Sequence, residues 1–220
     1  MVVAGGSGSR FGRPKQFLDL AGRPVIAWSV SAARSVADGV VVVVPAGPDG
    51  GAPDGGAPDG APWGADVVVA GGATRCDSVR SGLAAVPGDA AVIVVHDAAR
   101  PLAPASLWSS VVDALDAGGV DGAIPVLPVT DTLKRVADHT VTATVDRAGM
   151  VSVQTPQAFV AATLRAAHAG GDEATDDAGL LEALGATVRT VTGDPRNLKL
   201  THPEDLAVAL ALLPTDRVVP

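Results

Sequence analysis

The sequence predicts an α/β fold: a single domain with a doubly wound, mostly parallel sheet. Short valine-rich runs alternate with stretches of helical period along the chain, which is typical of that class. The runs are continuously apolar rather than alternating, which indicates strands covered on both faces. A length of 220 residues suits one domain with one sizeable core. We therefore treat residues 1–220 as one domain.

Each element follows from its own segment. Buried strands are expected at residues 1–4, 40–44, 66–70, 91–95, 122–126 and 187–191. Helices are expected at 24–36, 74–86, 104–118, 157–169, 176–185 and 203–213. Thr201 and Glu204 have the spacing of a capping box for the last helix, and Gly185 is expected to end the preceding one. The first strand is short, so either the sheet begins with a stub or its true start lies upstream.

Two segments interrupt this alternation. Residues 45–65 contain near-repeats of Gly-Ala-Pro-Asp-Gly, which favour turns and open coil and predict an exposed flexible loop rather than a binding lid. Residues 131–157 lack a helical period and are rich in Thr and Val. We expect a β-hairpin or arm that leaves the main sheet there, of the kind that often embraces a partner subunit.

Composition excludes several classes of function. The net charge is -8 and the pI is near 4.8, which argues against a nucleic-acid partner, since binding there needs a basic surface. No apolar stretch approaches the roughly 18 residues of a membrane span, and nothing resembles a signal peptide. The one cysteine, Cys76, excludes an internal disulfide and a cysteine metal cluster. We expect a cytoplasmic protein.

The loop after the first strand is rich in glycine and positive charge. It is not a dinucleotide fingerprint, because Phe11 stands where the third glycine belongs, and no P-loop motif occurs. Glycines let backbone N–H groups converge on an anion, and Arg10 and Lys15 would add positive charge. A phosphate chain, as in a nucleoside triphosphate, is the natural ligand. The alternative is an ordinary strand-to-helix turn whose charges are solvated.

The motifs of the chain match a known family. "AGGSGSRFGRPKQF" (4–17) resembles the signature loop of the sugar-phosphate nucleotidyltransferases. Further motifs narrow the resemblance, in order "HDAARP" (96–101), "DTLK" (131–134), "TVDRAG" (144–149), "TPQ" (155–157), "ATDDAG" (174–179) and "NLKLTHPEDL" (197–206). Together they resemble the 2-C-methyl-D-erythritol 4-phosphate cytidylyltransferase family of the non-mevalonate isoprenoid pathway. The resemblance implies a Rossmann-like nucleotidyltransferase fold and a homodimer joined by the arm.

The resemblance also implies a reaction. A phosphate oxygen of 2-C-methyl-D-erythritol 4-phosphate would attack the α-phosphorus of CTP in line, giving 4-diphosphocytidyl-2-C-methyl-D-erythritol and pyrophosphate. Such a step depends on positioning and on stabilising negative charge, so it needs no covalent nucleophile. Mg²⁺ is expected to be held mainly by CTP phosphates and water, because the sequence shows no dedicated metal cluster.

By similarity, Arg10 and Lys15 stabilise charge on the α-phosphate and on the departing pyrophosphate. The nucleotide would contact the opening loop and the segment before the second helix, at Ala4, Gly5, Gly6, Ser7, Gly8, Ser9, Arg10, Lys15, Gly72 and Ser78. A purely structural alternative exists for the last of these, since Thr74 or Ser78 could simply serve the start of a helix.

Arg147 and Lys199 match family positions that orient the acceptor phosphate. With them, the residues expected to bind the acceptor are Asp97, Arg100, Thr132, Arg147, Thr155, Thr175 and Lys199. Asp97 follows a buried strand, where open α/β sheets bind ligands, although it could cap a turn. Thr175 also reads as a helix N-cap, Thr132 and Thr155 as strand residues, and His96 as a packing residue. Because several of these lie in or beside the arm, each site would be built from two chains.

Three other functions remain open at the level of sequence. A cytidylyltransferase acting on ribitol 5-phosphate would share the loop and "HDAARP". A non-catalytic nucleotide-binding or regulatory protein would bind CTP without releasing pyrophosphate. The presence of Arg10, Lys15, Arg147 and Lys199 together argues against it, because a binder needs no residues to orient an acceptor. An enzyme of hexose 1-phosphates fits the later motifs less well.

Overall fold

The computed structural model describes residues 1–6, 11, 14–47 and 62–213. The main sheet contains β1 (Val2–Val3), β4 (Val41–Val44), β5 (Val67–Ala70), β6 (Val92–Asp97), β7 (Gly122–Pro128), β10 (Val151–Val153), β11 (Gln157–Val160) and β12 (Val188–Thr192). Two separate pairs are β2 (Asp19–Leu20) with β3 (Arg23–Pro24), and β8 (Leu133–Ala137) with β9 (Thr140–Val145). The helices are α1 (Val25–Arg34), α2 (Arg75–Ala85), α3 (Ala105–Asp116), α4 (Ala161–Ala169), α5 (Asp177–Ala183) and α6 (Asp205–Leu212), with short 3-10 turns η2 (Lys15–Phe17) and η3 (Pro62–Gly64).

The main sheet has the order β10-β7-β11-β6-β1-β4-β5. The strand β12 lies outside this path and pairs with β7. The predicted mostly parallel sheet is confirmed, since β6, β1, β4 and β5 run parallel and so do β7 and β12. It is nevertheless mixed, because β10 and β11 run antiparallel to their neighbours. All six predicted strands are present, and β1 consists of two residues.

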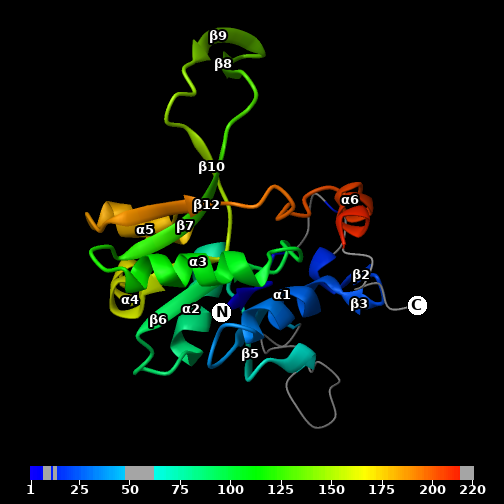
Figure 1. The fold of residues 1–220 in the computed structure, drawn as a ribbon, viewed down its shortest axis with the longest axis vertical. Helices are drawn as coiled ribbons and strands as arrows, with labels where there is room; N and C mark the ends of the chain where they lie inside the picture. The colour runs from blue at the N-terminus through cyan, green and yellow to red at the C-terminus, as the bar shows by residue number, and fades with distance from the viewer. Residues whose placement is uncertain (7–10, 12–13, 48–61, 214–220) are drawn as a thin grey trace.

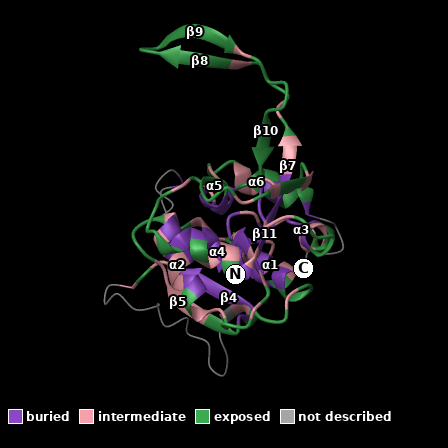
Figure 2. Ribbon diagram, turned by 90° about the vertical axis from the view of Figure 1, so that its left-hand side faces the viewer, coloured by how far each residue is buried: buried purple, intermediate pink, exposed green. Residues whose placement is uncertain are grey.

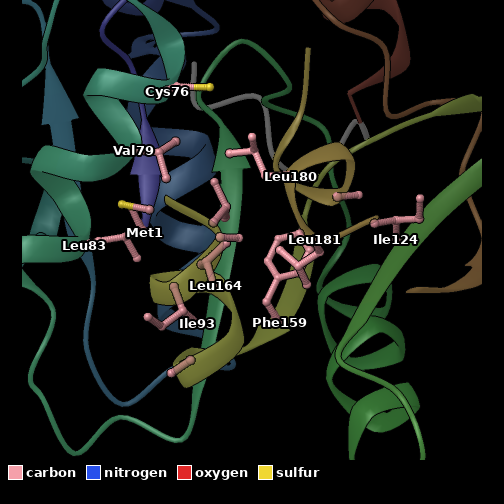
Figure 3. Close-up of a cluster of buried hydrophobic side chains, with 14 of the residues drawn as sticks. Met1, Cys76, Val79, Leu83, Ile93, Ile124, Phe159, Leu164, Leu180 and Leu181 are labelled. Carbon is pink, nitrogen blue, oxygen red and sulfur yellow. The ribbon is translucent and has the colours of Figure 1, made fainter. Parts of the chain in front are cut away.

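Helices cover both faces of this sheet (Figure 1). On one face, α1 and α3 pack on the strands through Ile26, Val30 and Trp108. On the other, α2, α4 and α5 enclose a second core, where Leu83, Leu164 and other labelled side chains converge (Figure 3). The two faces are served by alternate residues of the same strand, because successive side chains point to opposite sides. This is why the valine runs are apolar at every position.

Two element predictions were wrong in detail. The helix expected at 157–169 begins only at Ala161, because residues 157–160 form β11 between β6 and β7. The capping box of Thr201 and Glu204 does not form. Instead Asp205 accepts hydrogen bonds from the backbone N–H groups of Thr201 (2.6 Å) and His202 (2.8 Å). Gly185 does adopt the expected left-handed conformation, with φ +76°.

The segment expected to form an arm divides into two parts. Residues 151–153 and 157–160 pair within the main sheet, whereas β8 and β9 pair only with each other. This β8–β9 hairpin extends away from the body (Figure 1), and Figure 2 shows it exposed except at its inner end, where Leu133 and Val145 are half-buried. Residues 48–61 of the predicted flexible loop lie outside the described part. No helix of that part is long and apolar enough to cross a membrane.

Candidate active site

A cavity of about 520 Å³ opens at the carboxyl ends of β1 and β6, beside the first turn of α2. Its lining includes much of the predicted nucleotide site: Ala4, Gly5, Gly6, Lys15, Gly72 and Ser78. Asp97 and Lys199, predicted for the acceptor, line the same cavity. This edge is where ligands bind in open α/β sheets, so these two acceptor residues lie at the predicted nucleotide site. Ser7, Gly8, Ser9 and Arg10 lie outside the described residues.

The glycine-rich loop is closed by Gln16, a residue for which sequence reasoning had assigned no role. Its buried side-chain amide donates hydrogen bonds to the carbonyl oxygens of Ala4 (2.7 Å) and Gly6 (3.2 Å). Gln16 lies in η2 beside Lys15, so the same short turn closes the loop and places a cation at the cavity. The positive charge of Lys15 also contributes to lowering the pKa of the Asp205 carboxylate.

Two glycine turns meet at the start of α2. A Cβ at Gly5 would lie 2.7 Å from the Ser78 hydroxyl, and one at Gly72 would lie 2.2 Å from the Cβ of Asp77. A side chain at either position would clash with the first turns of α2, so both positions require glycine. Thr74 caps α2, because its side chain accepts from the N–H of Asp77 in a complete capping box. Ser78 lines the cavity, yet its hydroxyl donates to the Thr74 carbonyl (2.9 Å), so it also serves the helix start.

A second cavity, of about 330 Å³, shares one wall with the first. That wall consists of Arg75, Asp97 and Lys199, which line both cavities. The Nζ of Lys199 lies 2.7 Å from Oδ2 of Asp97, and the Nε of Arg75 lies 3.4 Å from Oδ1. We call these three residues the shared wall. It brings a carboxylate from the end of β6 together with cations from α2 and from the segment before α6.

The charges of the shared wall hold one another ionised. Burial on its own would raise the pKa of Asp97, but Arg75 and Lys199 outweigh it and hold that pKa well below its usual value. Burial likewise opposes the charge of Arg75, whose pKa is nevertheless raised by the carboxylates of Asp177 and Asp97. Asp97 is thus an anion between two cations, and it remains so at neutral pH.

The second cavity is lined by three more of the predicted acceptor residues, Arg100, Thr155 and Thr175. The hydroxyl of Thr155 accepts from the N–H of Asp97 (3.0 Å) and lies 3.1 Å from Nδ1 of His96. Nε2 of His96 lies 3.1 Å from the carbonyl oxygen of Arg100, which can only accept. The ring therefore carries its proton on Nε2, and Thr155 donates to Nδ1. Burial lowers the pKa of His96 to about 3, so it is a neutral packing residue, in agreement with that interpretation of the sequence.

The remaining acceptor residues have mixed positions. Arg100 donates to the backbone carbonyl oxygens of Asn197 (2.7 Å) and Val153 (3.3 Å), which anchors its guanidinium against the chain. Thr175 is not a helix cap, because Asp176 caps α5 by accepting from the N–H of Gly179.

Thr132 and Arg147 do not line either cavity of their own chain. Both are exposed at the base of the β8–β9 hairpin, where Arg147 donates to the carbonyl oxygens of Val129 and Thr130. A separate hollow of about 550 Å³ lies there, lined in part by Arg147. The structure thus divides the predicted acceptor residues between two places.

Sequence reasoning missed Arg75, although it stands inside the quoted stretch "TRCDSV". Its signal was weak: an arginine directly after a helix cap is normally a solvated surface residue. Its importance comes from Asp97 and Asp177, which approach it from 22 and 102 residues away in the sequence.

One known protein family matches nearly the whole chain. A profile of the family described as 2-C-methyl-D-erythritol 4-phosphate cytidylyltransferase matches residues 1–215. The chain belongs to this family. The membership accounts for the order of the motifs, which the resemblance had already indicated.

Individual members of the family are similar over nearly the whole chain. The protein named 2-C-methyl-D-erythritol 4-phosphate cytidylyltransferase from Nocardia farcinica is 47% identical, over 97% of this chain and 92% of its own. The one from Rhodococcus jostii is 46% identical, over 97% and 93%. The crystal structure of the Thermus thermophilus protein of that name superposes with a TM-score of 0.79 at 38% identity and covers 96% of both chains. The fold and the family are thus supported by independent comparisons.

Proposed function

We propose that this protein transfers CMP from CTP to 2-C-methyl-D-erythritol 4-phosphate, with release of pyrophosphate. The observation that carries the proposal is the shared wall, which separates a glycine-lined cavity from a second polar cavity while bordering both. Two substrates held on either side of one wall of fixed charges can meet at it. Family membership supplies the chemical identity of the two substrates.

In this proposal CTP occupies the glycine-lined cavity of about 520 Å³. The backbone N–H groups around Gly5, Gly6 and Gly72 face phosphate and base, and Lys15 offsets the charge that develops on the leaving pyrophosphate. Arg10, which lies outside the described residues, acts with it. No covalent intermediate is involved, because the acceptor phosphate itself attacks the α-phosphorus in line.

The acceptor occupies the second cavity. Lys199 stands in the shared wall, so its ammonium group can neutralise the attacking phosphate at the point where that phosphate meets CTP. Thr155, Thr175 and Arg100 border the space where the polyol chain would lie. The attack gains mainly from holding the two phosphates in line, which is the kind of positioning that accounts for most phosphoryl-transfer catalysis.

Mg²⁺ would accompany CTP. Among the described residues no group of three or more His, Cys, Asp or Glu side chains is arranged to hold a metal. In this proposal the ion is bound mainly by phosphate oxygens and water. Among the described residues that line the cavity of about 520 Å³, Asp97 is the one carboxylate, so it could serve as a protein ligand there. The ion would supply positive charge to the triphosphate.

The protein is proposed to act as a cytoplasmic homodimer in which the β8–β9 hairpin reaches the other subunit. The hairpin pairs with no other strand of the described structure, and Val136 and Val141 are 56% and 57% exposed on it. An isolated two-stranded hairpin is at best marginally stable in water, so a covering surface would stabilise it. A second subunit also explains why Thr132 and Arg147 lie away from the cavities of their own chain.

A direct assay tests the function. Purified protein is incubated with CTP, Mg²⁺ and either 2-C-methyl-D-erythritol 4-phosphate or ribitol 5-phosphate, and pyrophosphate release is followed. Release with the first acceptor, and little with the second, is the expected result. Release only with ribitol 5-phosphate would assign the other cytidylyltransferase activity. CTP binding without release on either acceptor would indicate a nucleotide-binding protein.

A further inference from the structure

A buried carboxylate lies behind the shared wall and is not part of either cavity. Asp177, in the first turn of α5, has no exposed side-chain surface. Its Oδ2 accepts from Nη2 of Arg75 (2.8 Å), and its Oδ1 lies 3.0 Å from Nε2 of His168. A carboxylate removed from water in this way is costly unless it is paired, and here both oxygens have partners.

The contacts of Arg75 are unusual for an arginine. Its Nε and Nη2 form one edge of the guanidinium group, and this edge normally binds both oxygens of a single carboxylate. Here the two nitrogens are divided between two carboxylates, with Nε toward Asp97 (3.4 Å) and Nη2 on Asp177 (2.8 Å). As a result, Arg75 uses only one oxygen of Asp97.

The other oxygen of Asp97 is the one that holds Lys199, at 2.7 Å. If Nη2 of Arg75 were not occupied by Asp177, its guanidinium edge would close on both oxygens of Asp97. Lys199 would then compete with a bidentate arginine for Oδ2. The side chain of Lys199 is 42% exposed, so its hydrogen bond to Asp97 is the contact that holds the ammonium group in the wall.

We propose that Asp177 is a positioning residue, which acts through Arg75 and Asp97 to keep Lys199 in place between the two substrates. The inference rests on the proposed function, since it assigns Lys199 a role toward the acceptor. It goes beyond that function because Asp177 lines neither cavity and the motif "ATDDAG" (174–179) that contains it gave it no role. Asp177 divides the hydrogen bonds of Arg75, and this division leaves one oxygen of Asp97 for Lys199.

Asp177→Asn is the informative variant, because it keeps the shape of the side chain and removes its charge. We expect kcat to fall and the KM for the acceptor to rise, with kcat/KM for the acceptor lower by about 10-fold to 100-fold. The KM for CTP should stay within about twofold, since the loop that closes around Lys15 is unaffected.

His168→Gln is the matched control. It disturbs the same carboxylate from the side away from the cavities and keeps an N–H donor for Oδ1, so it lowers the thermal midpoint without changing the kinetic constants. Equal kinetic losses in both variants would show that Asp177 is merely structural, and overturn the inference.

A double-mutant cycle tests the route. In a Lys199→Ala background, Asp177→Asn should change kcat/KM for the acceptor by no more than about twofold, because both changes act on one interaction. A full and additive loss there would contradict action through Lys199.

Arg75→Lys provides a second test at a side chain that is 25% exposed, whereas that of Asp177 is fully buried. A lysine keeps the positive charge but cannot bridge two carboxylates, so the same loss toward the acceptor is expected. Wild-type constants for Arg75→Lys would overturn the inference. An inactive wild-type protein would instead refute the proposed function, and the two failures are thereby distinguished.

Discussion

The shared wall and the β8–β9 hairpin both carry predicted acceptor residues, but in opposite settings. In the wall, Asp97 is 14% exposed and contacts two cations, so its surroundings within one chain define its position. At the hairpin base, Arg147 is exposed and donates only to backbone carbonyls of its own segment. The contacts of the wall are therefore made within a single chain, whereas the hairpin base keeps its predicted acceptor residues away from the cavities of that chain.

The largest expected effect comes from the cation beside the wall. Lys15→Ala should lower kcat by on the order of 10²–10³, because it removes charge stabilisation of the leaving pyrophosphate. The KM for the acceptor should change far less. Steady-state pyrophosphate release measures both. Lys134→Ala on the hairpin is the control, since that lysine contacts the Thr144 hydroxyl (2.6 Å) and is exposed. Near-normal turnover of the Lys15 variant would place Lys15 away from the chemistry.

Charge on the exposed face of the hairpin should break the proposed dimer. Val136→Asp is expected to weaken self-association by roughly 10-fold to 100-fold, as a buried carboxylate would at an interface. Sedimentation across a concentration series measures the shift. Val208→Asp is the matched control, since Val208 on α6 is 49% exposed and lies on the main body. If both variants associate like the wild type, the hairpin does not join subunits.

Arg147 would connect the two regions in the proposed dimer. Arg147→Ala should raise the KM for the acceptor by about tenfold while the KM for CTP stays the same. Mixing inactive Lys15→Ala with Arg147→Ala and allowing exchange should then restore about a quarter of the sites, because half the dimers are mixed and each holds one intact site. No recovery on mixing would mean that Arg147 serves its own chain.

A buried histidine and an exposed one should differ in how strongly each makes the stability of the protein depend on pH. Because burial lowers the pKa of His96 from 6.5 to about 3, only the unfolded chain binds that proton within this window. Stability should therefore fall as the pH decreases from about 6.5 toward 3. His96→Gln should remove a slope of up to about 1.4 kcal/mol per pH unit. Urea unfolding at several pH values measures it, and His139→Gln in the exposed hairpin turn is the control. Identical slopes for wild type and His96→Gln would refute the neutral ring.

Local sequence signals predicted most of the fold. Continuous valine-rich runs located the inner strands β4 and β6, because a strand covered on both faces needs apolar side chains at each position. The same signals failed at residues 157–160. That segment pairs antiparallel between β6 and β7, and nothing within four residues distinguishes it from the helix that follows. The helix cap Asp176 was missed in favour of Thr175 for a similar reason, since neighbouring polar residues compete for one cap. The capping box of Thr201 and Glu204 was wrong as well, because Asp205, the first residue of α6, accepts from the backbone N–H groups there.

The sequence by itself determined the fold class, the glycine loop at the end of the first strand and the family to which the chain belongs, because these depend on local patterns and ordered motifs. Only the tertiary structure decided that Arg75 and Gln16 belong to the site and that Asp177 lies behind it. Only the structure, likewise, put Arg147 away from the cavities. The physical reason is that the role of a charged side chain depends on which opposite charge lies within about 4 Å, and chain segments far apart in sequence supply that charge.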